Sequence, residues 1–500
     1  MRIKLIFWLV LIGTLSITFC NSRTGLFAKN EKRPVTERNS ESIESSLKLK
    51  VMLELATGSP MGQLHAVPVK LGKNAPKAFL AIYCADKVVD PYVEMFFFPT
   101  DTLKLMLFTE AGRVLWKREL GRGVVPGGWF CPFYPFDLNS DGVDEIWFVN
   151  NTDDEHPLGT KGRCLERINA LTGKTMGQWP WPKSAPRQNL SHVFRNFILG
   201  GYVKGMPVLV TAQGTYGPMK LQGWKPDMTL RWEYDIDRSK PGASGSHMCP
   251  VVDINNDGID EVLWGERCIE LDTGRELFCA DRDVYSEHSD VIQPVYDRSK
   301  NRWFIYTCRE GDPELSPRVV LFDDKGKRVW SDIDYGHIDI GWAARIGENG
   351  EHIVMAIRIG SKTAGPKGFF RQDMEEFSYK ALTGQKYLLP FSTYQTLPVD
   401  LNGDGIHELA KSSDEEMSLI IDGRGNVLGK VIGSAVMASK FIDHPGEQLL
   451  CYSSDGTLRI WADENAKDSA DALQRYNNPF YKASQALTAS GANKNLLGGL

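Results

Sequence analysis

Short apolar runs alternate with turn-forming residues along most of this 500-residue chain. A turn built on Gly or Asp, between two runs rich in Val, Ile, Leu, Trp and Tyr, recurs eight times, at residues 109–116, 169–176, 225–232, 270–277, 322–330, 380–387, 421–429 and 453–461. A second, more apolar segment precedes each turn, from HAVPVKL before the first copy to ASKFID before the last. This pattern predicts strands joined by hairpin turns.

Units of this kind, repeated at a spacing of ~40–65 residues with few helical stretches, are typical of the four-stranded blades of a β-propeller. Strands this short cannot bury both faces alone, so neighbouring blades around one axis supply the core. We therefore predict an all-β fold over residues 47–462, an eight-bladed β-propeller with calcium-binding loops, and keep seven blades as the alternative count. Two β-sandwiches are disfavoured, because eight similar units would divide between unlike sheets. Residues 463–500 carry helix formers, and we expect this tail to pack across the outside or one end of the propeller.

The N-terminus is predicted to direct export. Residues 1–20 combine a basic start with an apolar run from Leu5 to Phe19, which is too short for a confident membrane span. Cys20 is compatible with a lipoprotein anchor, whereas the bulky Phe19 before it favours simple cleavage. Residues 21–46 are polar and are expected to form a disordered leader. We expect a periplasmic, extracellular or cell-surface protein, with no transmembrane span and monomeric.

The charge and cysteine content exclude some classes of function. With 58 basic and 63 acidic residues the formal net charge is −5, so no basic field argues for nucleic acid. Nine cysteines are too sparse for a disulfide scaffold, and no CxxC or Cys/His group suggests zinc. A hairpin about Asp272–Gly274 would place Cys268 and Cys279 directly opposite, as a cross-strand disulfide or as two buried free thiols.

Three copies of one acidic motif predict calcium sites. DLNSDGVDE at 137–145, DINNDGIDE at 253–261 and DLNGDGIHE at 400–408 carry oxygen-bearing side chains at positions one, three, five and nine, with Gly at position six. Ca²⁺ requires such a ring of hard oxygen ligands. Strands are predicted to follow each copy, and the twelfth-position Glu of an EF-hand is missing. The expected ligands are Asp137, Asn139, Asp141 and Glu145; Asp253, Asn255, Asp257 and Glu261; and Asp400, Asn402, Asp404 and Glu408.

Five of the nine histidines share one place in the repeat, at or just before the first apolar strand of a unit: His65, His192, His247, His288 and His337. Equivalent positions of successive blades meet at one mouth of a propeller, so these imidazoles are predicted to face one funnel. Tyr394 occupies a similar place. His407 lies inside the third acidic motif and is expected to be solvated. A single such histidine is usually a packing group, but five in register favour a functional role for at least two.

The segment from Gln213 to Val295 resembles the propeller of the rhamnogalacturonan lyases of polysaccharide-lyase family eleven. The matching features are Gly-x-Tyr followed by Trp (Gly214, Tyr216 and Trp224), a His six residues before an acidic loop (His247), and His-x-Asp (His288 and Asp290). The resemblance implies an eight-bladed, calcium-laden propeller and a carbohydrate ligand. Ulvan lyases are a more distant cousin.

Three positions depart from that family's pattern. Its arginine beside the tyrosines is replaced by Gln213, its second aromatic by Thr215, and its second His after His-x-Asp by Gln293. We also expect none of that family's N-terminal accessory β-domains in this sequence. The resemblance therefore supports the fold and a carbohydrate ligand better than a particular polymer.

A lyase acting on a 4-linked uronate must neutralise the carboxylate, remove the C5 proton and protonate the leaving oxygen. We predict an acidic polysaccharide as substrate, Ca²⁺ as cofactor, His247 or His288 as the base and Tyr216 as the acid. The expected substrate-binding residues are Arg345 or Lys220 for the carboxylate, and His192, His337, Asp290 and Tyr394. Two alternatives stay open: a non-catalytic FG-GAP or VCBS-type calcium propeller that binds glycans or proteins, and a hydrolase using Asp290 and Asp339.

Overall fold

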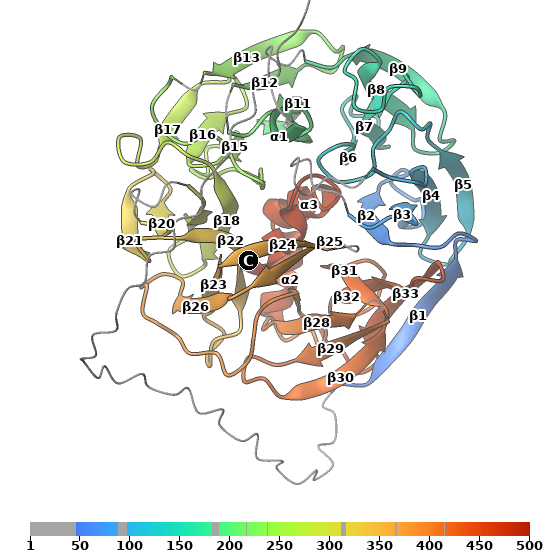
Figure 1. The fold of residues 1–500 in the computed structure, drawn as a ribbon. Coiled ribbons are helices and arrows are strands. Elements are labelled where there is room, and N and C mark those ends of the chain that lie inside the picture. The colour runs from blue at the N-terminus through green and yellow to red at the C-terminus, as the bar shows by residue number, and fades with distance from the viewer. Residues whose placement is uncertain are drawn as a thin grey trace, which may run out of the picture. The chain divides into compact units, whose positions relative to one another are not determined.

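The computed structural model describes residues 47–88, 98–182, 190–216, 218–237, 239–311, 317–365, 368–414 and 416–500. The expected export signal and leader (1–20 and 21–46) lie outside the described residues. The strands form eight successive blades around one axis (Figure 1). The prediction of an eight-bladed β-propeller is therefore confirmed.

Each blade is an antiparallel meander that runs from a buried inner strand to a half-exposed outer strand. The first four blades are β2 (Gln63–Val69), β3 (Ala78–Cys84), β4 (Lys104–Thr109) and β5 (Val114–Glu119); β6 (Phe133–Phe136), β7 (Glu145–Asn151), β8 (Arg163–Asn169) and β9 (Thr175–Pro180); β10 (Asn196–Val203), β11 (Met206–Gln213), β12 (Met219–Trp224) and β13 (Leu230–Ile236); and β14 (Val251–Val252), β15 (Glu261–Trp264), β16 (Arg267–Glu270) and β17 (Glu276–Cys279). The short helix α1 (Leu190–Val193) precedes β10.

Of the last four blades, the sixth and the eighth depart from this plan. The fifth and seventh are regular, with β18 (Ser289–Asp297), β19 (Arg302–Arg309), β20 (Val319–Asp323) and β21 (Arg328–Asp332), and with β27 (Thr396–Val399), β28 (Glu408–Asp414), β29 (Met417–Ile421) and β30 (Val427–Ile432). The sixth has three paired strands, β22 (His337–Arg345), β23 (His352–Ile359) and β26 (Glu375–Lys380), with the hairpin β24 (Ser361–Gly365) and β25 (Gly368–Gln372) inserted.

The eighth blade closes the ring with a strand from far away in the sequence. It contains β31 (Ser434–Ser439), β32 (Gln448–Tyr452) and β33 (Thr457–Asp463), and its outer strand is β1 (Leu49–Ala56). β1 pairs antiparallel with β33, so that Leu49 lies opposite Asp463. For this reason the eighth repeated turn joins the second and third strands of its blade, whereas the earlier turns lead out of the third strand.

Glycines of the repeated turns fit beneath tryptophans of the preceding blade. Trp232 of the third blade donates its indole N–H to the carbonyl of Leu271 in the fourth, at 2.7 Å. Gly274 of that turn has φ +70°, and a Cβ there would lie 2.6 Å from the Trp232 ring. Trp116 and Trp330 make the same bond to the second and sixth blades. The turn glycine is thus required by both backbone conformation and space.

The C-terminal tail lies among the inner strands (Figure 1), whereas the sequence led us to expect it across the outside or one end of the propeller. It comprises α2 (Ala470–Asn477), α3 (Pro479–Ala486) and the 3₁₀ helix η2 (Asn493–Gly499), which contact inner strands of seven blades. Asn493 accepts from the N–H of Cys249, and Gln293 donates to the carbonyl of Asn495 at 3.0 Å. Gln293, which stands where the related family has its second His, therefore holds the tail against the fifth blade.

The hairpin predicted between Cys268 and Cys279 forms, as β16 and β17, but the two cysteines are not opposite one another. The Glu270 N–H donates to the Arg275 carbonyl at the turn, and the resulting register places Cys268 opposite Phe278 and Cys279 opposite Arg267. A shift of one residue turns a side chain to the other face of the sheet. Both thiols are free in the structure.

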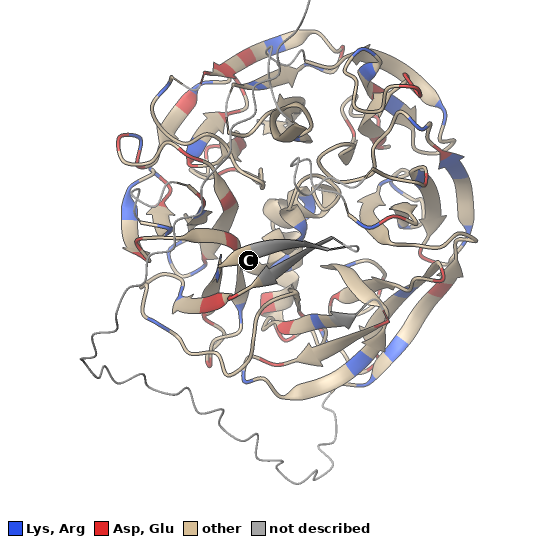
Figure 2. Cartoon of the chain, viewed as in Figure 1, with Lys and Arg blue, Asp and Glu red and all other residues tan. Residues whose placement is uncertain are grey.

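Acidic and basic side chains are interspersed around the ring (Figure 2). Among the described residues, every helix falls short of the length and apolar character that a bilayer crossing requires.

Candidate functional site

Polar side chains from the third to the sixth blade converge at one mouth of the ring. They lie at the starts of inner strands or just beyond the ends of second strands. These two positions are neighbours, because the first and second strands of a blade are antiparallel. This group comprises His192 in α1, Tyr216 after β11, His247 before β14, His288 and Asp290 at the start of β18, Glu310 after β19, and His337 and Asp339 at the start of β22. We call Tyr216, His247, His288, Asp290, Glu310 and His337 the histidine cluster.

Tyr216 occupies the centre of the histidine cluster. Its hydroxyl lies 2.9 Å from Nε2 of His247 and 3.3 Å from Nη2 of Arg195, which donates to it. Its ring meets the His288 ring edge-on, with centroids 4.1 Å apart. The backbone of Tyr216 has φ +74°, a left-handed conformation that costs a bulky residue about 1–3 kcal/mol. Backbone strain of this kind concentrates at functional sites, where the surrounding structure enforces it.

Carboxylates link the imidazoles into a continuous chain. Oδ1 of Asp290 lies 3.2 Å from Nδ1 of His247 and 3.3 Å from Nε2 of His288. Glu310 contacts both His288 and His337 through its two oxygens. Nε2 of His247 faces the Tyr216 hydroxyl, and its Nδ1 faces Asp290, so both ring nitrogens of His247 contact polar groups of the histidine cluster. Asp290 is 4% exposed, so water screens these contacts little.

Two overlapping sets in the histidine cluster have the geometry of metal ligands. The first is His247, His288 and Asp290, and the second is Asp290, Glu310 and His337; within each set the ligating atoms lie within 4.8 Å of one another. Imidazole nitrogens combined with carboxylate oxygens suit a divalent transition ion or zinc better than calcium. The donor set therefore fits a cation at this mouth, in addition to the oxygen-only loops.

Two cations at this mouth are not evident from the sequence pattern. Arg195 precedes β10 and lies over the Trp129 ring at 4.2 Å, with its guanidinium beside Tyr216. Arg195 lies next to the position at which this chain has Gln213 in place of the related family's arginine. The two are close because the N–H of Gly214 donates to the Arg195 carbonyl across the β10–β11 strand pair. Lys494 comes from the tail, two residues after Ala492 bonds to the carbonyl of His247. Neither residue belongs to a repeated motif, so only the folded ring associates them with the histidine cluster.

Four predicted residues lie elsewhere. Lys220 projects from β12 and pairs with Glu233 at 2.7 Å and Asp235 at 3.2 Å. Arg345 ends β22, the strand that His337 begins, and bonds to the Gly350 carbonyl and to Asp471. Tyr394 precedes β27 in the seventh blade. His65 lies in β2, where burial and then the charge of Lys494 lower its pKa to about 4. His192 does join the rim, with its ring centroid 5.9 Å from that of Tyr216.

The three acidic loops occupy one equivalent place, between the first and second strands of the second, fourth and seventh blades. In each loop the first Asp accepts from backbone N–H groups, as when Asp253 accepts from Asp257 and Gly258 at 3.0 Å. The ninth-position Glu turns back into the loop, as when Glu261 accepts from Ile254 at 2.9 Å. The sequence motif thus folds into the same ring of oxygens three times.

The donor chemistry of these loops fits calcium. Buried oxygens of Glu145 and Glu261 have no hydrogen-bond partner among the described residues. Burial raises the pKa of Glu261 to about 8, which means that the loop lacks a compensating positive charge. His407 of the third loop is 2% exposed and accepts from the Arg345 N–H, so the expectation that it is solvated is wrong.

The chain is similar in sequence and in fold to known rhamnogalacturonan lyases. No family model matches the chain. It is 27% identical over 266 residues to the rhamnogalacturonan exolyase YesX of Bacillus subtilis (strain 168), over 45% of this chain and 43% of that protein. It is 26% identical over 267 residues to the rhamnogalacturonan endolyase YesW of the same strain, over 45% of this chain and 42% of that protein. The match thus spans less than half the length of either curated relative.

Solved structures show the same likeness of fold. The exotype rhamnogalacturonan lyase YesX superposes with a TM-score of 0.70 and 17% identity, over 89% of this chain and 80% of that chain. A rhamnogalacturonan lyase from Bacillus licheniformis superposes with a TM-score of 0.67, over 88% of this chain and 80% of that chain. The resemblance to rhamnogalacturonan lyases inferred from the sequence is confirmed.

Proposed function

We propose that this protein is a polysaccharide lyase that cleaves a uronate-containing polysaccharide, rhamnogalacturonan or a related polymer, by β-elimination. The observation that carries the proposal is the chain of polar contacts at one mouth of the ring, in which Arg195 and His247 hydrogen-bond to the Tyr216 hydroxyl and Asp290 lies 3.2 Å from His247. The sequence likeness to two rhamnogalacturonan lyases supports the same reaction class.

β-Elimination moves one proton onto the enzyme and another onto the leaving group. A base removes the C5 proton, the C4–O bond breaks, a C4=C5 double bond forms, and an acid protonates the departing oxygen. We assign His288 as the base, with His247 as the alternative, and Tyr216 as the acid. The contact between the Tyr216 hydroxyl and Nε2 of His247 allows a proton to be shared between them. Asp290 holds both imidazoles in position.

The uronate carboxylate needs a positive charge, because removal of the C5 proton places further negative charge next to it. Arg195 supplies that charge beside Tyr216, in place of the Arg345 or Lys220 expected from the sequence. A divalent cation held by the imidazoles and carboxylates of the histidine cluster would add Lewis-acid stabilisation when bound. His192, beside Tyr216, and His337, which contacts Glu310, would contact neighbouring sugar hydroxyls.

We also propose that Ca²⁺ binds the three acidic loops and rigidifies the connections between the first and second strands of their blades. The equivalent placement of the loops and the partnerless oxygens of Glu145 and Glu261 support this role. An acidic polymer as substrate agrees with the expected export, because such polymers lie outside the cytoplasm.

The test is to incubate the purified protein with pectic and algal uronates and to follow the ultraviolet absorbance of the new double bond. His288→Ala and His247→Ala should keep their fold, checked by circular dichroism, and lose product formation. Lys220→Ala, which removes a charge that is paired with Glu233 and Asp235 on β13, is the matched control and should retain activity. Full activity in both histidine variants would refute the assignment. Polymer binding without any unsaturated product would instead support a glycan-binding propeller.

A further inference from the structure

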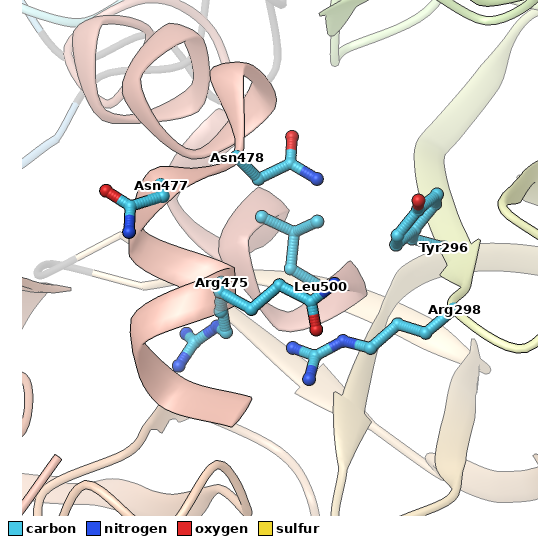
Figure 3. Close-up of a pocket in the computed structure, with 7 residues that line it drawn as sticks. Tyr296, Arg298, Arg475, Asn477, Asn478 and Leu500 are labelled. Atoms are coloured by element: carbon cyan, nitrogen blue, oxygen red, sulfur yellow. The ribbon is translucent and has the colours of Figure 1, made fainter. Parts of the chain in front are cut away.

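A second polar cavity opens at the opposite mouth of the ring. It has a volume of about 390 Å³ and lies between the end of β18 and the helix α2 (Figure 3). Arg298, which follows β18, reaches toward α2 across it. His288 lies at the other end of that nine-residue strand, roughly 26 Å away at about 3.3 Å per residue. The cavity is therefore separate from the histidine cluster.

Three guanidinium groups gather around this cavity. The side chain of Arg475 is fully buried, and those of Arg345 and Arg298 are 13% and 19% exposed. Among the described residues, Nη1 and Nη2 of Arg298 and Nε and Nη1 of Arg475 have no hydrogen-bond partner. Buried donors without partners cost folding free energy unless a ligand satisfies them.

Acidic neighbours offset this charge only in part. Oδ2 of Asp471 lies 3.3 Å from both Arg298 and Arg345, although Asp471 is largely exposed. Glu447 pairs with Arg475 at 2.7 Å, and Asp400 lies 3.7 Å from it. Asp400 also belongs to the third acidic loop, so a bound Ca²⁺ would draw its charge away from Arg475. The arginines, after burial, lower the pKa of the nearby His352 to about 3, consistent with a positive potential here.

The remaining wall offers groups that recognise sugars. Gln474 and Asn477 on α2, and Asn478 between α2 and α3, contribute amide groups to the lining, and Asn478 points into the cavity in Figure 3. Tyr296 presents a ring that is held against Trp303 with centroids 4.7 Å apart. The lining therefore offers amides for sugar hydroxyls, an aromatic face for a sugar ring and guanidinium groups for a carboxylate. Inorganic phosphate would use only the guanidinium groups.

We propose that this cavity is a second ligand site that binds a small carboxylated sugar, a uronic acid or a short acidic oligosaccharide. The carboxylate pairs with Arg298 and Arg475, and the hydroxyls bond to the α2 amides. The proposal goes beyond the lyase function and does not depend on it, because binding at this mouth is measured without turnover.

Isothermal titration with galacturonate, galactose and inorganic phosphate tests the proposal. Galacturonate should bind, and Arg298→Gln should weaken that binding by about tenfold or more. Lys300→Gln removes an exposed charge two residues away and should leave binding unchanged. Neutral galactose should bind at least about tenfold more weakly.

Galacturonate could also bind at the histidine cluster, so Tyr216→Phe is measured alongside. Binding lost in Arg298→Gln and kept in Tyr216→Phe supports the second site. Binding lost in Tyr216→Phe and kept in Arg298→Gln would overturn it, as would phosphate binding with no galacturonate binding. Arg298→Gln should leave any lyase activity intact, so failure of the second site and failure of the proposed function are distinguishable.

Discussion

The two mouths of this propeller are built from opposite ends of the same inner strands, yet their polar side chains are held in different ways. At one mouth, Tyr216, His247 and Asp290 contact one another across three blades. At the other mouth, the acidic loops bind mainly their own backbone, as Asp253 does within six residues. The first arrangement exists only when neighbouring blades are docked, whereas the second is complete within a single turn. A histidine cluster assembled across blades is suited to chemistry, and a self-contained loop to stability.

The largest expected effect on activity is that of a substitution at Tyr216, in the histidine cluster. Tyr216→Phe removes one hydroxyl and should lower lyase activity by about 10²–10³-fold, because the leaving oxygen loses its proton donor. Initial rates of double-bond absorbance measure the loss. Tyr202→Phe, at an exposed tyrosine of β10, is the matched control and should keep full activity. Wild-type rates in Tyr216→Phe would remove Tyr216 from the proposed mechanism.

Removal of calcium should act on the opposite mouth through stability. A chelator should lower the free energy of unfolding by about 3 kcal/mol for each site that was filled at a hundredfold excess over its Kd. Asp253→Asn should abolish the second loop's share of the chelator's effect on the free energy of unfolding. Asp227→Asn, in an exposed turn outside the three loops, should leave the chelator's effect unchanged. Denaturant unfolding with and without chelator makes the measurement. Identical curves would contradict calcium binding in these loops.

A change at the outer rim should affect neither mouth. Gly274→Ala is expected to cost about 2 kcal/mol, because φ +70° disfavours a side chain and Trp232 fills the space. Gly205 has φ +83° with no atom within 4 Å of a built Cβ, so Gly205→Ala carries the backbone cost alone. The difference between the two unfolding free energies isolates the contact with Trp232. Equal costs would show that this contact is unimportant.

The smallest expected effect concerns two buried histidines, His65 and His352, that lie outside the histidine cluster. Burial lowers the pKa of His65 to about 4 and that of His352 to about 3, against 6.5 ordinarily. Between pH 6.5 and 4 the unfolded chain therefore binds more protons, and the free energy of unfolding falls as pH falls. The slope is at most about 1.4 kcal/mol per pH unit for each histidine. His65→Gln and His352→Gln should each flatten it, and unchanged slopes would contradict the burial.

Several features were predictable because they depend on nearby residues. The repeated turns, the inner strands and the acidic loops follow from turn chemistry and apolar patterning within about ten residues. The register of His192, His247, His288 and His337 also follows, once the units are treated as equivalent. His65 shares this register but lies apart from the histidine cluster, and, after burial, the groups that shift its pKa, Lys494 and Thr488, belong to the tail.

Other features depend on residues that are distant in sequence. The guanidinium beside Tyr216 comes from Arg195, although the sequence pointed to Arg345 or Lys220 for a carboxylate partner. Arg345 begins as a plausible candidate because it shares β22 with His337, but a nine-residue strand carries it to the other mouth. The register of the β16–β17 hairpin leaves Cys268 and Cys279 one residue out of opposition, and periodicity does not reveal this register.

By itself the sequence determined how many blades there are, which strands are innermost and where three oxygen-rich loops lie, since backbone propensities and turn residues act locally. Only the tertiary structure decided that β1 closes the eighth blade, that the tail lies among the inner strands, and that Asp290 joins two histidines from different blades. The physical reason is that these contacts form between segments up to hundreds of residues apart. Their partners are selected by packing of the closed ring, which no local pattern encodes.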